Sequence, residues 1–178
     1  MKKTEIRICG LGGQGVVLAG QILGKAAVNH GKNATQTQSY GAEARGSAAK
    51  SELVISDQKI GYPMVRKCDI LVAMNQDAVD KNIKDLKEDG TLLIDSTNVA
   101  SLPETKIRTF KIPATETAEK EIGAKLYANI IMLGALTKAT RIVDETSMIE
   151  AINSSFPEKA VDKNIEAYNR GKQLATQN

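Results

Sequence analysis

The alternation of apolar and polar residues divides residues 1–112 into short strands joined by helices and turns. Residues 5–9 alternate, whereas residues 70–74 and 91–95 form short, mostly apolar runs, as expected for parallel strands buried on both faces. Helical periodicity runs from Val16 to Val28, and Gly31 is placed to end that helix. A strand, a glycine turn and a helix in this order open a βαβ unit.

The remaining pattern predicts a sheet followed by helices. Further strands are expected over residues 34–38, 49–56 and 106–112, a loop over 39–47, and a helix over 76–86 that Asn75 caps. After Pro113 the pattern becomes helical over residues 115–122, 127–137, 145–154 and 158–175. We therefore predict one α/β domain over residues 1–178, with a Rossmann-like, mostly parallel sheet, helices on both faces and a helical C-terminal third.

Composition narrows the classes of partner. The chain is 42% hydrophobic and 25% charged, which is ordinary for a soluble globular protein, and its net charge of +3 is too small to indicate nucleic acid. No apolar run approaches the roughly 20 residues that span a bilayer, and the N-terminus lacks the apolar core of a signal peptide. We expect a cytoplasmic protein that binds neither membrane nor nucleic acid.

The sequence also argues against a metal centre on this chain. Cys9 and Cys68 are far apart in apolar, strand-like surroundings, which favours buried free thiols. The only histidine, His30, stands at a predicted helix end. Neither an iron–sulfur cluster nor a zinc site is expected, and no Ser-His-Asp or Cys-His arrangement is plausible. We expect no catalytic residue on this chain alone.

The glycine turn is the first candidate site. Its residues are Gly10, Gly12, Gly13, Gln14 and Gly15, in a G-x-G-x-x-G pattern between a strand and a helix. Such turns let a phosphate approach the N–H groups of the helix N-terminus. The acidic residue that would hold a dinucleotide ribose about 20 residues further on is missing. NAD binding therefore stays open, but a tight turn used for packing or for part of another ligand is favoured.

The predicted loop over residues 39–47 is the second candidate. Tyr40, Glu43, Arg45 and Gly46 lie among small residues, and Arg45 offers a forked donor for a carboxylate or phosphate. A solvated loop with one surface ion pair is an equally good interpretation.

Two further polar residues follow or precede apolar elements. Asp95 ends a strand where α/β sheets gather ligands, although a turn or capping role is favoured. Asn129 precedes an apolar helix and is expected to form capping or core hydrogen bonds.

Read together, these motifs resemble the gamma subunit, or gamma domain, of 2-oxoacid:ferredoxin oxidoreductases. The matching segments are residues 10–15 (GLGGQG), 39–46 (SYGAEARG) and 129–136 (NIIMLGAL), followed by Phe156, Asn164, Ala167 and Gly171. The similarity covers nearly the whole chain in the right order and is greatest to the 2-oxoglutarate branch. One departure is Ser47, which stands where the family often has a second glycine after Gly46.

The resemblance implies a subunit that is inactive alone. Such complexes oxidatively decarboxylate a 2-oxoacid with coenzyme A, giving acyl-CoA, carbon dioxide and reduced ferredoxin. By the same resemblance, thiamine diphosphate, Mg and Fe–S clusters belong to alpha, beta and delta partner subunits, while this chain is a structural and coenzyme A-facing component. The competing hypotheses are a stand-alone NAD(P)-binding oxidoreductase and a nucleotide-sensing module.

Overall fold

A six-stranded sheet forms the centre of the molecule, with strand order β2-β3-β1-β4-β5-β6. The computed structural model describes residues 3–42 and 46–176. The strands are β1 (Lys3–Leu11), β2 (Asn33–Tyr40), β3 (Ala48–Ser56), β4 (Cys68–Ala73), β5 (Leu86–Asp95) and β6 (Arg108–Ile112). β1, β4, β5 and β6 run parallel, and β3 is antiparallel to both of its neighbours. The prediction of a mostly parallel sheet is confirmed.

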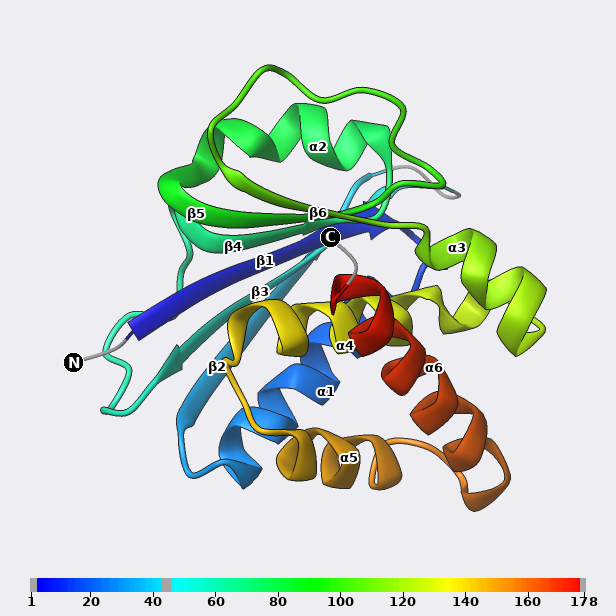
Figure 1. Cartoon of the computed structure of the whole chain (residues 1–178). Helices are drawn as coiled ribbons and strands as arrows, with labels where there is room; N and C mark the ends of the chain where they lie inside the picture. Colours follow the sequence, from blue (N-terminus) through cyan, green and yellow to red (C-terminus); the bar gives the residue numbers. More distant parts are fainter. Residues whose placement is uncertain (1–2, 43–45, 177–178) are drawn as a thin grey trace.

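The helices cover the two faces of the sheet unequally (Figure 1). They are α1 (Val16–Asn29), α2 (Gln76–Asn82), α3 (Ala114–Thr117), α4 (Ala128–Thr140), α5 (Glu145–Asn153) and α6 (Glu158–Thr176). α1, α4, α5 and α6 gather on one face, and α2 lies on the other. The Rossmann-like arrangement with a helical C-terminal third is therefore confirmed. None of the helices in residues 3–42 and 46–176 is both long and apolar enough to cross a membrane.

Two predicted helices have different bounds in the structure. The helix expected to reach Leu86 ends at Asn82; a 3₁₀ turn, η1 (Ile83–Asp85), follows, and β5 begins at Leu86. Leu86 is buried and pairs with Cys68 of β4, so strand pairing overrides the local helical preference. The helix expected over residues 115–122 is α3 followed by a π-helical turn, η2 (Ala118–Ile122).

The face that carries four helices is packed through glycines. α4 crosses α6 so closely that a Cβ atom on Gly134 would overlap the carbonyl oxygen of Tyr168. A Cβ atom on Gly171 would overlap the carbonyl oxygen of Ile131 in the same way. These two glycines, which the sequence offered only as part of a resemblance, allow the backbones of the two helices to touch.

The face beneath α2 contains a buried ion network. Arg7 of β1 is 4% exposed, and its Nε donates to Glu52 at 2.7 Å while its Nη1 donates to Asp85 at 2.6 Å. Nη2 donates to the carbonyl oxygen of Val65 at 3.2 Å. Burial alone would lower the pKa of Arg7, but the hydrogen bonds to Asp85 and Glu52 outweigh it and raise that pKa above its ordinary value. Arg7 therefore stays charged and joins β1, β3 and the turn η1 that follows α2.

Candidate functional site

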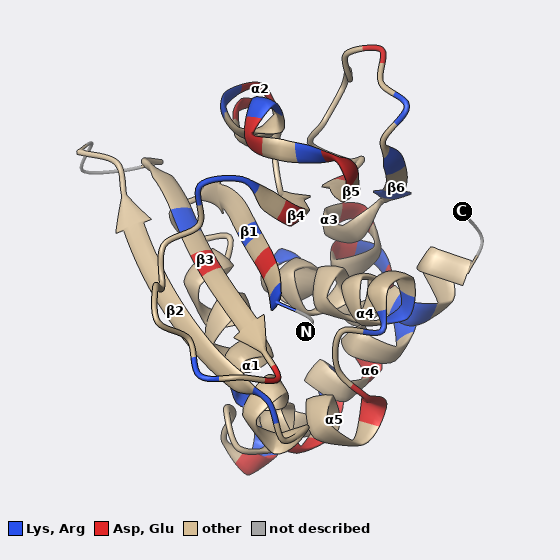
Figure 2. Ribbon diagram, turned by 90° about the vertical axis from the view of Figure 1, so that its left-hand side faces the viewer, with Lys and Arg blue, Asp and Glu red and all other residues tan. Residues whose placement is uncertain are grey.

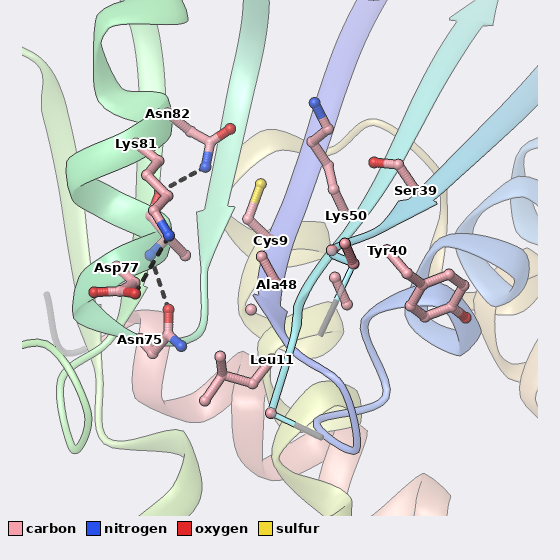
Figure 3. Close-up of a pocket in the computed structure, with 16 residues that line it drawn as sticks. Cys9, Leu11, Ser39, Tyr40, Ala48, Lys50, Asn75, Asp77, Lys81 and Asn82 are labelled. Atoms are coloured by element: carbon pink, nitrogen blue, oxygen red, sulfur yellow. Dashed lines mark hydrogen bonds and ion pairs between the residues drawn. The ribbon is translucent and has the colours of Figure 1, made fainter. Parts of the chain in front are cut away.

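A pocket of about 540 Å³ opens at the C-terminal end of β1, between α2 and the adjoining ends of β2 and β3 (Figure 3). This edge of the sheet is where open α/β folds gather ligands. Gly10 from the glycine turn lines the pocket together with Tyr40 and Gly46 from the second candidate segment. The structure thus brings together residues from the two motifs singled out in the sequence.

Two lysines bring positive charge to the pocket. Lys50 of β3 and Lys81 of α2 both line it, with 36% and 65% of their side chains exposed. Lys81 lies 3.4 Å from Asp77, and Lys50 lies 3.7 Å from Glu52, so each ammonium group is only partly neutralised. Partly exposed ammonium groups beside a concave surface are suited to an anionic ligand.

The amides on the α2 wall are already used by the fold. Asn75 Oδ1 accepts from the N–H of Ala78 at 2.8 Å and caps α2, as predicted. Asn82 Nδ2 donates to the carbonyl oxygen of Ala78 at 2.8 Å. The lysines are therefore the side chains on these walls that are best placed to contact a ligand.

Gln14 has a structural role in the glycine turn. Its Oε1 accepts from the N–H of Leu11 at 2.7 Å, and its Nε2 donates to the carbonyl oxygen of Met74 at 3.2 Å. The backbone φ is positive at Gly13 (+92°) and Gly15 (+70°), where a side chain would be strained. Gly12 is outside this left-handed region, but its N–H donates to the carbonyl oxygen of Ser47 at 2.8 Å and so fixes the turn to the second motif.

The third matching segment contacts the same turn. Asn129 of α4 is 4% exposed, and its Nδ2 donates to the carbonyl oxygen of Gly15 at 3.1 Å. A Cβ atom on Gly15 would overlap the Asn129 amide. The interpretation of Asn129 as a core hydrogen-bonding residue is confirmed, and the turn serves the close approach of α1 and α4.

Asp95 also belongs to the scaffold. It is fully buried, and its carboxylate accepts from the N–H of Thr97 at 3.1 Å and from Asn98 Nδ2 at 3.0 Å. The N–H and hydroxyl of Thr115 donate to it as well. These bonds hold the turn after β5 against the start of α3, which confirms the turn role favoured from the sequence.

The second motif is described only in part. Tyr40 is 59% exposed, and its ring points away from α2 (Figure 3). Glu43 and Arg45 lie outside the described residues, so their contact with a ligand stays a prediction.

The sequence analysis did not single out three charged residues that line the pocket, Lys50, Asp77 and Lys81. The signal for two of them was present, because Asp77 and Lys81 stand four residues apart after a buried strand and so share one helical face.

The strand order disfavours a dinucleotide site. In a dinucleotide-binding βαβ unit the second strand lies next to the first and brings its acidic residue to the ribose. Here β3 lies between β1 and β2 and runs antiparallel to both. The end of β2 is thus one strand further from the glycine turn, and Tyr40 stands there instead of an acid.

The described part of the chain contains neither a metal-binding cluster nor an exposed cysteine. No group of three or more His, Cys, Asp or Glu residues within residues 3–42 and 46–176 is arranged to hold a metal ion. Cys9 and Cys68 are buried, and burial raises their pKa values to about 12 and about 11. Both thiols therefore stay protonated near neutral pH.

Comparison with known proteins places these features in a family. The model of the pyruvate ferredoxin/flavodoxin oxidoreductase family matches residues 5–174. The 2-oxoglutarate synthase subunit KorC of Methanocaldococcus jannaschii is 49% identical, over 97% of this chain and 94% of that subunit. These matches confirm the resemblance to subunits of 2-oxoacid oxidoreductases.

Two solved structures share the fold. The gamma subunit of a keto/oxoacid ferredoxin oxidoreductase from Geobacter sulfurreducens has a TM-score of 0.88 and 42% identity, covering 98% of this chain and 99% of that one. The 2-oxoglutarate:ferredoxin oxidoreductase of Magnetococcus marinus, with 2-oxoglutarate, coenzyme A and succinyl-CoA bound, has a TM-score of 0.90 and 26% identity, covering 100% of this chain but 32% of that one. This chain belongs to the pyruvate ferredoxin/flavodoxin oxidoreductase family and has the fold of its gamma subunits.

Proposed function

We propose that this chain is the gamma subunit of a complex that oxidises 2-oxoglutarate with coenzyme A and passes the electrons to ferredoxin. The observation that carries this proposal is the 49% identity to a 2-oxoglutarate synthase subunit over nearly the whole of both chains. A structure of a 2-oxoglutarate-oxidising enzyme that contains an equivalent of this whole chain supports the same substrate.

The reaction loses the first carboxyl group of the 2-oxoacid as carbon dioxide. The former keto carbon bonds to the sulfur of coenzyme A, the thiol proton is released, and two electrons reduce ferredoxin. In this proposal, thiamine diphosphate with Mg and the iron–sulfur clusters are held by alpha, beta and delta subunits. Among the described residues of this chain, no group of three or more His, Cys, Asp or Glu is arranged to hold a metal ion.

This chain would contribute to holding the anionic coenzyme. Lys50 and Lys81 face a concave space at the edge of the sheet, and lysine ammonium groups bind phosphates. Lys50 shares the carboxylate of Glu52 with Arg7, whereas Lys81 lies closer to its own partner Asp77, so the charge of Lys50 is the less neutralised of the two. We propose that Lys50 contacts a phosphate of coenzyme A and that Arg45 adds a second, forked donor.

The first test is co-purification from the native organism. A tagged chain should recover larger thiamine-binding subunits, and the eluate should reduce a viologen dye when 2-oxoglutarate and coenzyme A are both present. Preference for another 2-oxoacid would overturn the substrate. Recovery of the chain alone, without thiamine-binding partners, would overturn the gamma-subunit assignment and favour a regulatory module.

The second test addresses the coenzyme. In the assembled complex, Lys50→Ala should raise the KM for coenzyme A about 10-fold while the KM for 2-oxoglutarate stays unchanged, since a charge-assisted contact contributes about 1.5 kcal/mol. Lys159→Ala on α6 is the matched control, because it removes an exposed lysine that does not line the pocket. An unchanged KM for coenzyme A in the Lys50 variant would remove this pocket from the binding site.

A further inference from the structure

The segment that joins β3 to β4 presents large apolar side chains to solvent. Residues 57–67 form no helix or strand, and Tyr62 and Met64 are 53% and 45% exposed. Pro63 between them is exposed as well, and the segment runs across the viewer's side of the molecule in Figure 2. Exposed aromatic and methionine side chains in one place are typical of protein interfaces.

This segment is nevertheless anchored to the core. Val65 is 6% exposed and packs in the apolar cluster beneath α2, and Ile60 packs against the same cluster. The carbonyl oxygen of Val65 accepts from the buried guanidinium of Arg7 at 3.2 Å. Tyr62 and Met64 are therefore held outward beside the buried Val65 and the partly buried Ile60. A surface ordered before binding loses less conformational entropy when a partner covers it.

Positive charge surrounds these apolar side chains. Tyr62 and Met64 share a surface hollow with Lys3, Arg66, Lys67 and Lys87. Glu5 also lines the hollow and pairs with Lys3 at 3.0 Å and with Lys87 at 3.2 Å, whereas Arg66 and Lys67 form ion pairs with none of the described residues. The Arg66 guanidinium lies 6.0 Å from the centre of the Tyr62 ring.

We propose that Tyr62, Met64, Arg66 and Lys67 form a docking surface for an acidic surface of another subunit of the same complex. This inference rests on the proposed role as a gamma subunit. An acidic partner would place carboxylates against Arg66 and Lys67 and an apolar side chain against Tyr62 and Met64. A second copy of this chain fits less well, because a two-fold axis would bring the same unpaired cations together.

The position of this docking surface is compatible with the ligand pocket. Lys3 and Glu5 at the start of β1 line the docking hollow, whereas Gly10 and Leu11 at its end line the pocket. At about 3.3 Å per residue, the two ends of this strand lie roughly 25 Å apart. A subunit bound at residues 62–67 leaves the mouth of the pocket available to the coenzyme.

The proposal is tested by titrating the complex that lacks this chain with wild-type and altered chains. Tyr62→Ala should weaken binding about 30-fold, as expected for a central aromatic contact. Arg66→Glu combined with Lys67→Glu should weaken it by a similar factor at low salt and by less at high salt, because salt screens exposed charges. The loss in Tyr62→Ala should persist at high salt.

Matched controls alter equally exposed residues elsewhere. Leu126→Ala removes an apolar side chain that is 64% exposed, and Lys106→Glu with Lys159→Glu reverses two exposed lysines. Unfolding curves should match the wild type for all variants, because the altered side chains are exposed. If both the Tyr62 variant and the charge-reversal variant bind with wild-type affinity, the proposed docking surface is wrong. The gamma-subunit proposal would stand in that case, because the wild-type chain still binds the complex.

The same titration separates the other possibilities. If the wild-type chain does not bind the rest of the complex, the gamma-subunit proposal fails and this inference fails with it. The charge-reversed chain could instead bind the other subunits normally and lose an affinity for RNA that the wild-type chain has. It could also fail to form a dimer that the wild-type chain forms in sedimentation experiments. Either result would mean that this surface binds a different partner and that the inference is wrong.

Discussion

The two faces of the sheet differ in how they are packed. The face covered by α1, α4, α5 and α6 is apolar. Two helices on this face, α4 and α6, contact each other backbone to backbone at Gly134 and Gly171. The face beneath α2 carries the Arg7 ion network and the pocket lined by Lys50 and Lys81. The first arrangement leaves little room for adjustment, whereas the second joins charged groups from three elements beside an open pocket. One face is therefore closed by tight apolar packing, and the other combines a buried ion network with the candidate binding pocket.

The largest expected effect comes from breaking the ion network. Arg7→Met removes the cation between Glu52 and Asp85 and leaves Glu52, whose side chain is 9% exposed, with only the longer contact to Lys50. Leaving a buried charge without its partner costs about 3–5 kcal/mol. We therefore expect the free energy of unfolding, measured in urea, to fall by about that amount.

An exposed arginine serves as the control, because its substitution removes the same charge without leaving a buried partner. Arg108→Met removes an exposed guanidinium that lies 4.8 Å from the centre of the Phe110 ring, and it should cost no more than about 1 kcal/mol. Combining Arg7→Met with Glu52→Gln should recover part of the loss, because the uncompensated carboxylate is gone. Equal effects of the Arg7 and Arg108 substitutions would show that the network contributes nothing beyond an exposed charge.

The opposite face is tested through its glycines. Gly134→Ala places a methyl group on the carbonyl oxygen of Tyr168, a backbone atom that cannot rotate away. We expect a loss of about 3 kcal/mol in the free energy of unfolding, at the upper end of the range for overpacking.

A second helical glycine provides the control for that substitution. A Cβ atom on Gly24 of α1 would lie 3.7 Å from Leu53 Cδ2, an ordinary contact. Gly24→Ala should therefore raise stability by up to about 1 kcal/mol through helix propensity. A stable Gly134→Ala variant would show that α4 and α6 can separate at little cost.

The sequence predicted this two-faced fold better than it predicted the site. Apolar runs identified β4 and β5, because strands buried on both faces need apolar side chains throughout. The direction of β3 could not be read, since an alternating pattern is the same for parallel and antiparallel pairing. The early end of α2 depends on the pairing of Leu86 with Cys68, a contact between separate segments.

The pocket shows the same limit. Gly10, Tyr40 and Gly46 were singled out from motifs, and the structure places them around one cavity. Lys50 and Lys81 come from separate elements, and each alone resembles a surface lysine. Their shared place in the pocket depends on how α2 lies against β1 and β3, which no local pattern encodes.

A smaller effect distinguishes the helix caps on the two faces. Asp144 caps α5 by accepting from the N–H of Ser147 at 2.7 Å, and this hydrogen bond holds the pKa of Asp144 below its ordinary value. Asn75 caps α2 in the same way but does not titrate. Asp144→Ala and Asn75→Ala should each cost about 1 kcal/mol at neutral pH.

Acid should separate the two caps. The lowered pKa of Asp144 stabilises the fold above the unfolded value of about 3.9, and that contribution is lost as the pH falls through the lower folded value. The difference between wild type and Asp144→Ala should therefore narrow between about pH 5 and pH 3, whereas the difference for Asn75→Ala should stay constant. If the stability difference from wild type narrows equally for Asp144→Ala and Asn75→Ala, a group other than Asp144 causes the pH dependence.

The smallest expected effect is alkaline and belongs to the face beneath α2. Burial raises the pKa of Cys9 to about 12 and that of Cys68 to about 11, whereas thiols in the unfolded chain ionise near 8.5. A raised folded pKa contributes stability that is present below the unfolded value and is lost as the pH rises toward the folded value. Between about pH 7.5 and pH 8.5, where thiols of the unfolded chain begin to ionise, we expect the free energy of unfolding in urea to fall by less than about 1 kcal/mol, and by less again in Cys9→Ala, while native thiols react with Ellman's reagent only slowly. Rapid labelling of Cys9 in the folded chain would show instead that the pocket admits solvent to the thiol, and that this face is more open than its buried network implies.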